Sequence, residues 1–366
     1  MKDLLKSYYF NLQGWKTSRK ILVIESDDWG AERLASKQIS EELIRNKWVS
    51  NTNYNCLDTL ESAQDYYAMI EVLSSVKDVH SNHAVLTANY VVSNPDYDKI
   101  ARNKSTTYYY LPFTECYEKV KGSENTQTAM QQAIDNKLFV PQFHGREHLQ
   151  TYLWIKNLGQ SKVLQAGFER NFFSFSRGEA GPLSYLSAFD YETEEQRVDL
   201  LQRIQDGCRL FQSTFGFFPE TIIAPENTYN SSLLFDFEKM GFKGIQGSRM
   251  QKQTQISNQN LPNLPRKLGA YSQQNLVSLV RNVTFEPSAS NKDFVSKALG
   301  EIAVAFMFNK PAVICSHRVN YVGGISEINR NNSLTQLREL LKQVVKKWPT
   351  VEFMSSAQLS RCIEEN

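Results

Sequence analysis

Two of the five histidines in this 366-residue chain have a spacing that could serve metal chemistry. His144 and His148 enclose the sequence His-Gly-Arg-Glu-His, directly after a short apolar stretch. In a helical turn, residues four apart share one face, so both imidazoles could bind a single metal ion. The glycine between them permits a sharp turn from strand to helix. The alternative is a pair of exposed helical histidines that bind no metal.

Two adjacent acids, Asp27 and Asp28, end another apolar run, KILVIESDD. Neighbouring carboxylates repel each other, and placing them near an apolar core costs free energy that a bound cation would remove. Alternatively, one of the two caps the helix that follows, as strand-to-helix loops often require. Trp29 comes next and either stacks on a sugar ring or packs in the core or at its rim.

His317 follows a third apolar segment, AVICS. A histidine at the carboxyl end of a strand lies on the face where barrel enzymes build their active sites. A structural role is the alternative for a lone histidine. Acids or histidines at three separate strand ends favour a metal-dependent hydrolase over three unrelated structural roles. His80 and His83 are expected at the opposite end of a strand and are interpreted as structural.

Short apolar segments alternate with helical patterns along the chain. The segments expected to form strands are 20–28, 84–92, 137–143, 220–224, 242–245, 276–285, 312–315 and 351–354, and those expected to form helices are 57–76, 126–136, 192–215, 291–308 and 333–346. This alternation implies parallel strands joined by right-handed crossovers. We therefore predict an α/β fold, a distorted (β/α) barrel of seven or eight strands. An open doubly wound sheet is the alternative, although the first strand lacks a following GxGxxG.

Two segments have compositions unlike the rest of this predicted single domain, 1–366. Residues 93–125 are polar and rich in tyrosine, and residues 247–275 are rich in Gln, Asn and Ser. We expect both to be insertions that form loops over one face of the barrel. The tyrosines at 108–110 either line a carbohydrate groove or pack on the barrel.

The overall composition excludes several classes of protein. With 41 Lys+Arg against 39 Asp+Glu, the charge provides no strong electrostatic case for binding nucleic acid. Five cysteines without a CxxC argue against a disulfide framework. No apolar run approaches the ~20 residues that a membrane span needs. The first 20 residues lack the features of a secretory signal, so we expect the cytoplasm.

The order of these motifs resembles that of the polysaccharide deacetylases, carbohydrate esterase family four, in the glycoside hydrolase/deacetylase barrel superfamily. The resemblance extends over residues 20–320. It implies a divalent metal, usually zinc, and assigns the ligands as Asp28, His144 and His148. It further implies that Asp27 is the general base and that His317 is the general acid.

The third motif of the family corresponds here to Ile223-Ala224-Pro225-Glu226. The resemblance implies that a backbone N–H near Pro225 and Glu226 helps to hold the oxyanion. The arginine with which this motif orients the base in the family is missing. The candidates to replace it are Arg318, Arg249, Arg281 and Arg146. The family's Asp-x-x-Asp-Trp motif is not recognisable at 244–249, and Glu286 is the candidate to orient His317 instead.

The resulting prediction is a cytoplasmic, metal-dependent hydrolase that removes an acetyl group from an N-acetylated or O-acetylated sugar or polysaccharide precursor. Its expected partner is a carbohydrate, with no nucleic acid and no membrane span. Trp29, Pro225, Glu226, Arg318 and Glu286 are the expected substrate-binding or orienting residues. Two alternatives stay open: a hydrolase of a non-sugar C–N bond such as a cyclic amide, and a carbohydrate-binding relative that has lost the chemistry.

Overall fold

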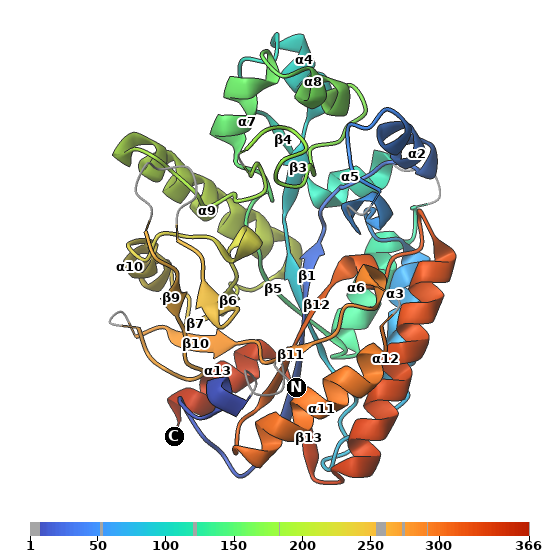
Figure 1. Ribbon diagram of the computed structural model, residues 1–366, viewed down its shortest axis with the longest axis vertical. Coiled ribbons are helices and arrows are strands. Elements are labelled where there is room, and N and C mark those ends of the chain that lie inside the picture. Colours follow the sequence, from blue (N-terminus) through green and yellow to red (C-terminus); the bar gives the residue numbers. More distant parts are fainter. Residues whose placement is uncertain are drawn as a thin grey trace.

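The computed structural model describes residues 8–51, 54–119, 123–182, 184–253, 261–272, 275–290 and 292–365. Within these ranges, nine strands form one sheet in which every pair is parallel. They are β1(Lys20–Trp29), β2(Leu86–Tyr90), β5(Phe139–Phe143), β6(Thr221–Ile222), β7(Gly244–Gly247), β10(Val277–Val280), β11(Val283–Thr284), β12(Ala312–His317) and β13(Val351–Met354). Figure 1 shows β1 and β12 side by side in the middle of the molecule.

The two ends of the strand order lie in one continuous segment of the chain. The order is β10-β7-β6-β5-β2-β1-β12-β11, and only Arg281 and Asn282 separate β10 from β11. The Arg281 N–H donates to the Gly247 oxygen, and the Asn282 N–H donates to the Val313 oxygen, both at 3.0 Å. Residues 277–284 therefore bind β7 with their first half and β12 with their second. The predicted distorted (β/α) barrel is confirmed, and the one strand expected at 276–285 is divided in two.

Strand β1 is the centre of the sheet and carries the first pair of acids. Nine of its ten residues are buried, as expected for a strand of a parallel sheet that is covered on both faces. It pairs with β12 along one side, and with β13 and then β2 along the other. In the β1–β12 register, Asp27 lies opposite His317. The sheet thus places these two residues next to each other at its carboxyl end.

Helices cover the outside of the barrel (Figure 1). They are α3(Ala63–Ser74), α6(Thr126–Asp135), α9(Glu194–Phe215), α10(Leu233–Lys239), α11(Phe294–Met307) and α12(Glu327–Lys347). The last helix, α13(Ser356–Glu364), instead packs with Ile21 and Val23 of β1, on the face of the sheet opposite to these helices. The helix predicted at 57–76 begins later, because Ser62 and Asp65 form a capping box. The helix predicted at 333–346 begins earlier, where the Ser326 side chain accepts the Asn329 N–H. None of the helices in the described ranges is long and apolar enough to cross a membrane.

The two expected insertions contain secondary structure and are not plain loops. The first holds an antiparallel pair, β3(Ser93–Pro95) with β4(Tyr110–Pro112), together with α4(Tyr97–Arg102) and α5(Phe113–Lys119). The second holds a short antiparallel pair, β8(Met250–Gln251) with β9(Leu264–Pro265). Part of it, 254–260 and 273–274, lies outside the described residues. Backbone pairing within each insertion satisfies polar groups that an unpaired loop would leave to water.

A second hydrophobic core lies outside the barrel and was not predicted. It joins α2(Lys37–Arg45), α4, α7(Thr151–Leu158) and α8(Lys162–Phe168), and its members with the least exposure are Leu43, Ile100, Leu149, Trp154, Leu164 and Phe172. We call the described residues of the segments that share this core, within 34–56, 97–109 and 149–186, the cap. Figure 1 shows α4, α7 and α8 together at the top, beyond the barrel. Tyr108 and Tyr109 pack against this core, so at least these two of the three tyrosines contribute to packing.

Candidate metal centre

Asp28, His144 and His148 meet at the carboxyl ends of β1 and β5. The Nε2 atoms of His144 and His148 each lie 3.5 Å from Oδ1 of Asp28. In a tetrahedral site with bonds of about 2.0–2.1 Å, two ligand atoms are about 3.3–3.4 Å apart. All three side chains are buried, and their potential ligand atoms lie within 4.8 Å of one another. The spacing of the three residues therefore fits a single metal ion.

An irregularity in β1 explains how two adjacent acids can face the same cavity. Successive side chains of a regular strand point to opposite faces of the sheet. The β1–β2 register shifts between Ser26 and Trp29, and Asp28 has a φ of 75°. Such an irregularity redirects a side chain, and a positive φ in a residue other than glycine is a strained conformation often found at functional sites. Asp27 and Asp28 both line the cavity as a result.

The segment that carries the two histidines is a loop, so the expected helical turn is wrong. Residues 144–150 lie between β5 and α7 without helical structure. Gly145 has a φ of 106°, a conformation that L side chains rarely adopt. His144 Nδ1 lies 3.0 Å from the Ile223 oxygen, which directs Nε2 toward Asp28. His148 Nδ1 is buried without a hydrogen-bond partner in the described part of the chain.

Arg33 lowers the pKa values of two of these three residues, Asp28 and His148. Its Nη2 donates to Oδ1 of Asp28 at 2.8 Å. Burial would raise the pKa of Asp28, but the charge of Arg33 and the hydrogen bond from His144 outweigh it and hold this pKa well below its usual range. Burial lowers the pKa of His148, and the charge of Arg33 lowers it further. An ionised carboxylate and a neutral imidazole are the forms that bind metals.

Of the four candidate arginines, the structure places Arg281 on Asp27. Arg281 donates from Nη1 to Oδ2 at 2.7 Å and from Nη2 to Oδ1 at 2.6 Å. Its Nε also donates to Oε2 of Glu25 at 2.6 Å. Burial would raise the pKa of Asp27, but Arg281 lowers it well below its usual range. Asp27 is therefore an ionised and rigidly held carboxylate, as a base requires.

Arg318 is not positioned to contact a substrate. Its side chain is fully buried and donates to Asp58 Oδ1 at 3.1 Å and to Glu61 Oε2 at 2.6 Å. The expectation that Arg318 binds or orients substrate is corrected by this placement. The reason is that the residue after His317 begins a short helical turn, Arg318–Asn320, which takes the side chain away from the cavity.

Trp29 belongs to the barrel core and does not form a sugar-stacking surface. It has no exposure, its Nε1 donates to Oγ of Ser26 at 3.0 Å, and its ring lies 5.0 Å from that of Phe139. Of the two alternatives left open by the sequence, core packing is therefore the correct one. The irregularity in β1 is consistent with this, since it turns Asp28 into the cavity and Trp29 away from it.

His317 is held by Glu286, the residue that follows β11 by two positions. His317 Nδ1 lies 2.6 Å from Oε1 of Glu286, and its Nε2 lies 3.7 Å from Oδ2 of Asp27. Asn320 fixes Glu286 in turn, with Nδ2 donating to Oε2 at 2.7 Å. Cys315 lies near this pair, and burial raises the pKa of its thiol.

These residues surround a cavity of about 180 Å³. Its lining comes from the barrel and from the cap, and consists of Asp27, Asp28, Arg33, Asn55, His144, His148, Ser176, Arg177, Leu186, Ala224, Glu226, Asn227 and His317. Pro225 is buried at the start of a turn in which Glu226 has a φ of 55°. The hydroxyls of Ser184 and Ser187 donate to Oε2 of Glu226 at 2.6 and 2.5 Å. Sequence reasoning missed Arg33, Arg177 and both serines, because no motif marks them.

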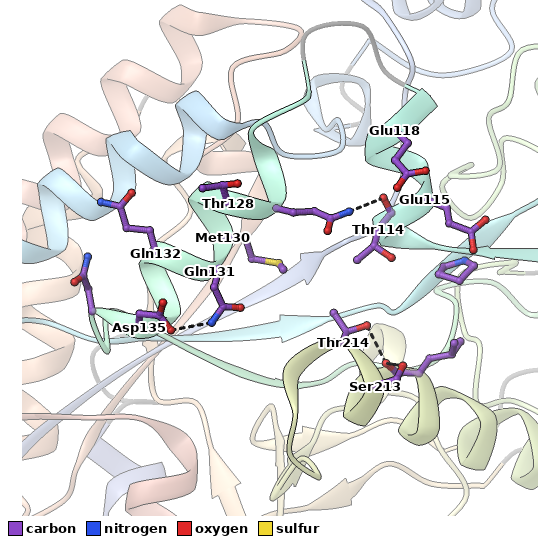
Figure 2. A pocket seen from close by; sticks show the side chains of 14 residues that line it. Thr114, Glu115, Glu118, Thr128, Met130, Gln131, Gln132, Asp135, Ser213 and Thr214 are labelled. Atoms are coloured by element: carbon purple, nitrogen blue, oxygen red, sulfur yellow. Dashed lines mark hydrogen bonds between the residues drawn. The ribbon is translucent and has the colours of Figure 1, made fainter.

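A larger hollow elsewhere on the molecule offers no comparable chemistry. Figure 2 shows this groove of about 990 Å³, which is lined by residues of α5, α6 and α9. Its walls are mostly Thr, Gln, Ser and Glu side chains, and the described residues that line it include no histidine or cysteine. The smaller cavity at the strand ends is therefore the candidate site of reaction.

Fold and site together define a class: a (β/α) barrel with an aspartate and two histidines positioned for one metal ion at the carboxyl ends of its strands. No family model matches the sequence, and no curated protein matches it either. A putative glycoside hydrolase/deacetylase from Parabacteroides distasonis matches in structure, with a TM-score of 0.51, 9% identity, and coverage of 95% of this chain and 72% of that one. The fold expected from the resemblance to this superfamily is thereby confirmed.

Two further solved structures match with lower scores. A putative polysaccharide deacetylase from Mycobacterium smegmatis has a TM-score of 0.44 and 10% identity, and the match covers 96% of this chain and 93% of that one. The 4-alpha-glucanotransferase from Thermococcus litoralis has a TM-score of 0.47 and 9% identity over 93% of this chain, which spans only 40% of that protein. Similarities at such identities concern the fold, so the reaction has to be argued from the residues of the site.

Proposed function

We propose that this protein is a metal-dependent hydrolase that removes an acetyl group from an N-acetylated or O-acetylated sugar. The observation that carries the proposal is the arrangement of Asp28, His144 and His148 around one point, beside Asp27 and His317. Two imidazole nitrogens and one carboxylate oxygen form a donor set that suits Zn²⁺. When bound there, the metal would lower the pKa of a water molecule and polarise the acetyl carbonyl.

In the proposed reaction, Asp27 accepts a proton from the attacking water. The water oxygen forms a bond with the acetyl carbon, and the bond from that carbon to the sugar nitrogen or oxygen breaks. His317 donates a proton to the departing atom, so that acetate and a free amine or hydroxyl are the products. Arg281 keeps Asp27 ionised and Glu286 fixes the ring of His317. The backbone N–H of Glu226 is the proposed donor to the developing oxyanion.

The cysteines support the proposal that the protein works in the cytoplasm. None of the five forms a disulfide, and four of them are buried. Unpaired thiols are typical of proteins in reducing compartments. Burial raises the pKa of Cys56 to about 11 and that of Cys116 to about 12, so these thiols are poor nucleophiles and are interpreted as structural.

The experiment that tests the proposed function measures acetate release by the zinc-loaded protein from N-acetylated and O-acetylated sugars. We expect Asp27→Asn and His317→Ala each to lower the rate by about 10²–10⁴-fold, the usual contribution of a general acid or base. His80→Ala is the matched control, because this side chain is 61% exposed and does not line the cavity. Unchanged rates in both variants would refute the assignment. Sugar binding without acetate release would favour the non-catalytic alternative, and release of product only from cyclic amides would favour the other hydrolase.

A further inference from the structure

The cap covers the cavity and is fastened to the residues around the metal centre. Arg33, which binds Asp28, also donates from Nη1 to Oγ of Ser174 in the cap at 3.0 Å. Ser184 lies in the cap, and Ser187 is the first residue beyond it. The hydroxyls of both donate to Glu226, in the turn that follows β6. The cap segments also contribute Asn55, Ser176, Arg177 and Leu186 to the cavity lining. The cap therefore covers the candidate site at the carboxyl face of the barrel.

The cap limits the size of the group that can reach the metal centre. Cavities that hold drug-sized ligands usually measure about 300–1,000 Å³, whereas this one measures about 180 Å³. It has room for one sugar ring or a molecule of similar size. An internal unit of a polymer would need an exit for the chain on both sides, and hydrogen bonds from Arg33 to Ser174 and from Ser184 to Glu226 join the cap to the barrel at two places.

The charges of the cavity leave one cation without a carboxylate partner among the described residues. Asp27 is paired with Arg281, Asp28 with Arg33, and Glu226 with two hydroxyls. Arg177 is exposed, and its Nε donates to the Pro182 oxygen at 3.2 Å. Across the described ranges of the chain, Arg177 forms no ion pair with a carboxylate. The nearby acid in sequence, Glu179, instead accepts the backbone N–H groups of Ser50 and Ser176.

We propose that the substrate is a single acylated sugar, or the end unit of a chain, that carries an anionic group bound by Arg177. This inference rests on the proposed function for the reaction but adds the size and the charge of the substrate. A guanidinium binds carboxylate and phosphate oxygens through two parallel N–H donors, so both kinds of anion suit this position. Leu186 and Ala224 are the two apolar residues of the lining, and its other residues are polar or charged.

The first part of the test measures kcat/KM for acetate release by the zinc-loaded protein from four compounds. They are N-acetylglucosamine, its 6-phosphate, the corresponding 6-carboxylate, and a hexamer of N-acetylglucosamine. We expect one or both anionic sugars to exceed the neutral sugar by about tenfold or more, as hydrogen bonds to a charged group allow, and no acetate from internal units of the hexamer. Equal values for neutral and anionic sugars would overturn the charge inference, and rapid hydrolysis within the hexamer would overturn the size inference.

The second part uses variants and a binding measurement. Arg177→Ala should bring the ratio of kcat/KM between anionic and neutral sugars close to one, and Arg177→Lys should retain part of it. Lys162→Ala is the matched control, because Lys162 is an exposed cation of the cap outside the cavity lining. Calorimetric binding of glucosamine 6-phosphate and of glucosamine is measured in parallel. If no compound releases acetate, the proposed function fails. In that case, tighter calorimetric binding of glucosamine 6-phosphate than of glucosamine that depends on Arg177 would still support the inference. Equal binding of the two compounds would refute it.

Discussion

Arg281 holds Asp27 through two parallel hydrogen bonds of 2.7 and 2.6 Å, although 254 positions separate the two residues in the chain. The arginine lies at the junction of β10 and β11, where the barrel closes on itself. It also binds Glu25, which lies two residues before Asp27 on the same strand and therefore has the same orientation. One guanidinium thus binds two buried carboxyl groups beneath the candidate site, and it keeps Asp27 ionised while burial raises the pKa of Glu25.

Replacing Arg281 should affect both stability and activity. Arg281→Met leaves Glu25 and Asp27 buried without a counter-charge, so we expect the free energy of unfolding to fall by about 3–5 kcal/mol. Arg281→Lys should be milder in stability but should still reduce acetate release, because an ammonium group cannot form the two parallel bonds. Urea unfolding and acetate-release assays measure the two effects. Full stability and activity in Arg281→Met would show that the two carboxylates do not need the arginine.

Metal binding at the candidate centre should depend on both of its histidines. Purified protein should contain about one equivalent of zinc or a similar ion, the number that one group of three ligands can bind. His144→Ala and His148→Ala should lose this metal, and a chelator should lower the thermal midpoint of the wild-type protein, because a ligand that binds only the folded state stabilises it.

His83→Ala serves as the control for metal content. His83 lies before β2, with Nδ1 3.1 Å from the Val76 oxygen, and takes no part in the centre. Elemental analysis of all four proteins makes the comparison. An absence of metal from wild type after reconstitution with zinc would overturn the assignment of the ligands.

Glu286 should act on the reaction through His317. Glu286→Gln removes the carboxylate that fixes the imidazole, and supporting residues of this kind usually contribute about 10–100-fold. We expect kcat to fall by this amount with little change in KM, because Glu286 does not line the cavity. Glu327→Gln, at an exposed helix start, is the matched control. An effect on KM alone would instead indicate that Glu286 contacts the substrate.

Trp29 should matter for stability and not for substrate binding. Trp29→Phe removes the hydrogen bond to Ser26 and part of a buried ring, so we expect a loss of about 1–3 kcal/mol in the free energy of unfolding. KM for an acetylated sugar should be unchanged, since the indole has no exposure and packs against Phe139. Denaturant unfolding and steady-state kinetics test this. A raised KM in a Trp29→Phe variant of unchanged stability would indicate that Trp29 contacts the substrate.

Local sequence patterns are enough to locate the strands of the barrel and the residues that end them. Asp27, Asp28, His144 and His317 each follow an apolar run, and parallel strands bring their carboxyl ends to one face. That rule is local, because a strand and the residue after it are neighbours in the chain. The two histidines and the pair of acids can therefore be selected from the sequence pattern, although a loop and not a helix brings the histidines together. The choice of Asp28 over Asp27 as the third ligand comes from the family resemblance and not from the pattern.

The partners of these residues follow only from the tertiary fold. Nothing near Arg281 or Arg33 in the sequence marks them as the partners of Asp27 and Asp28. From the sequence alone, Arg281 is only one of four equal candidates for the arginine that orients Asp27. The cap is equally hidden, because its apolar residues look like those of any helix until they are seen to form a core of their own. Charge pairing and burial depend on distances in space between segments far apart in the chain, and a linear pattern does not contain these distances.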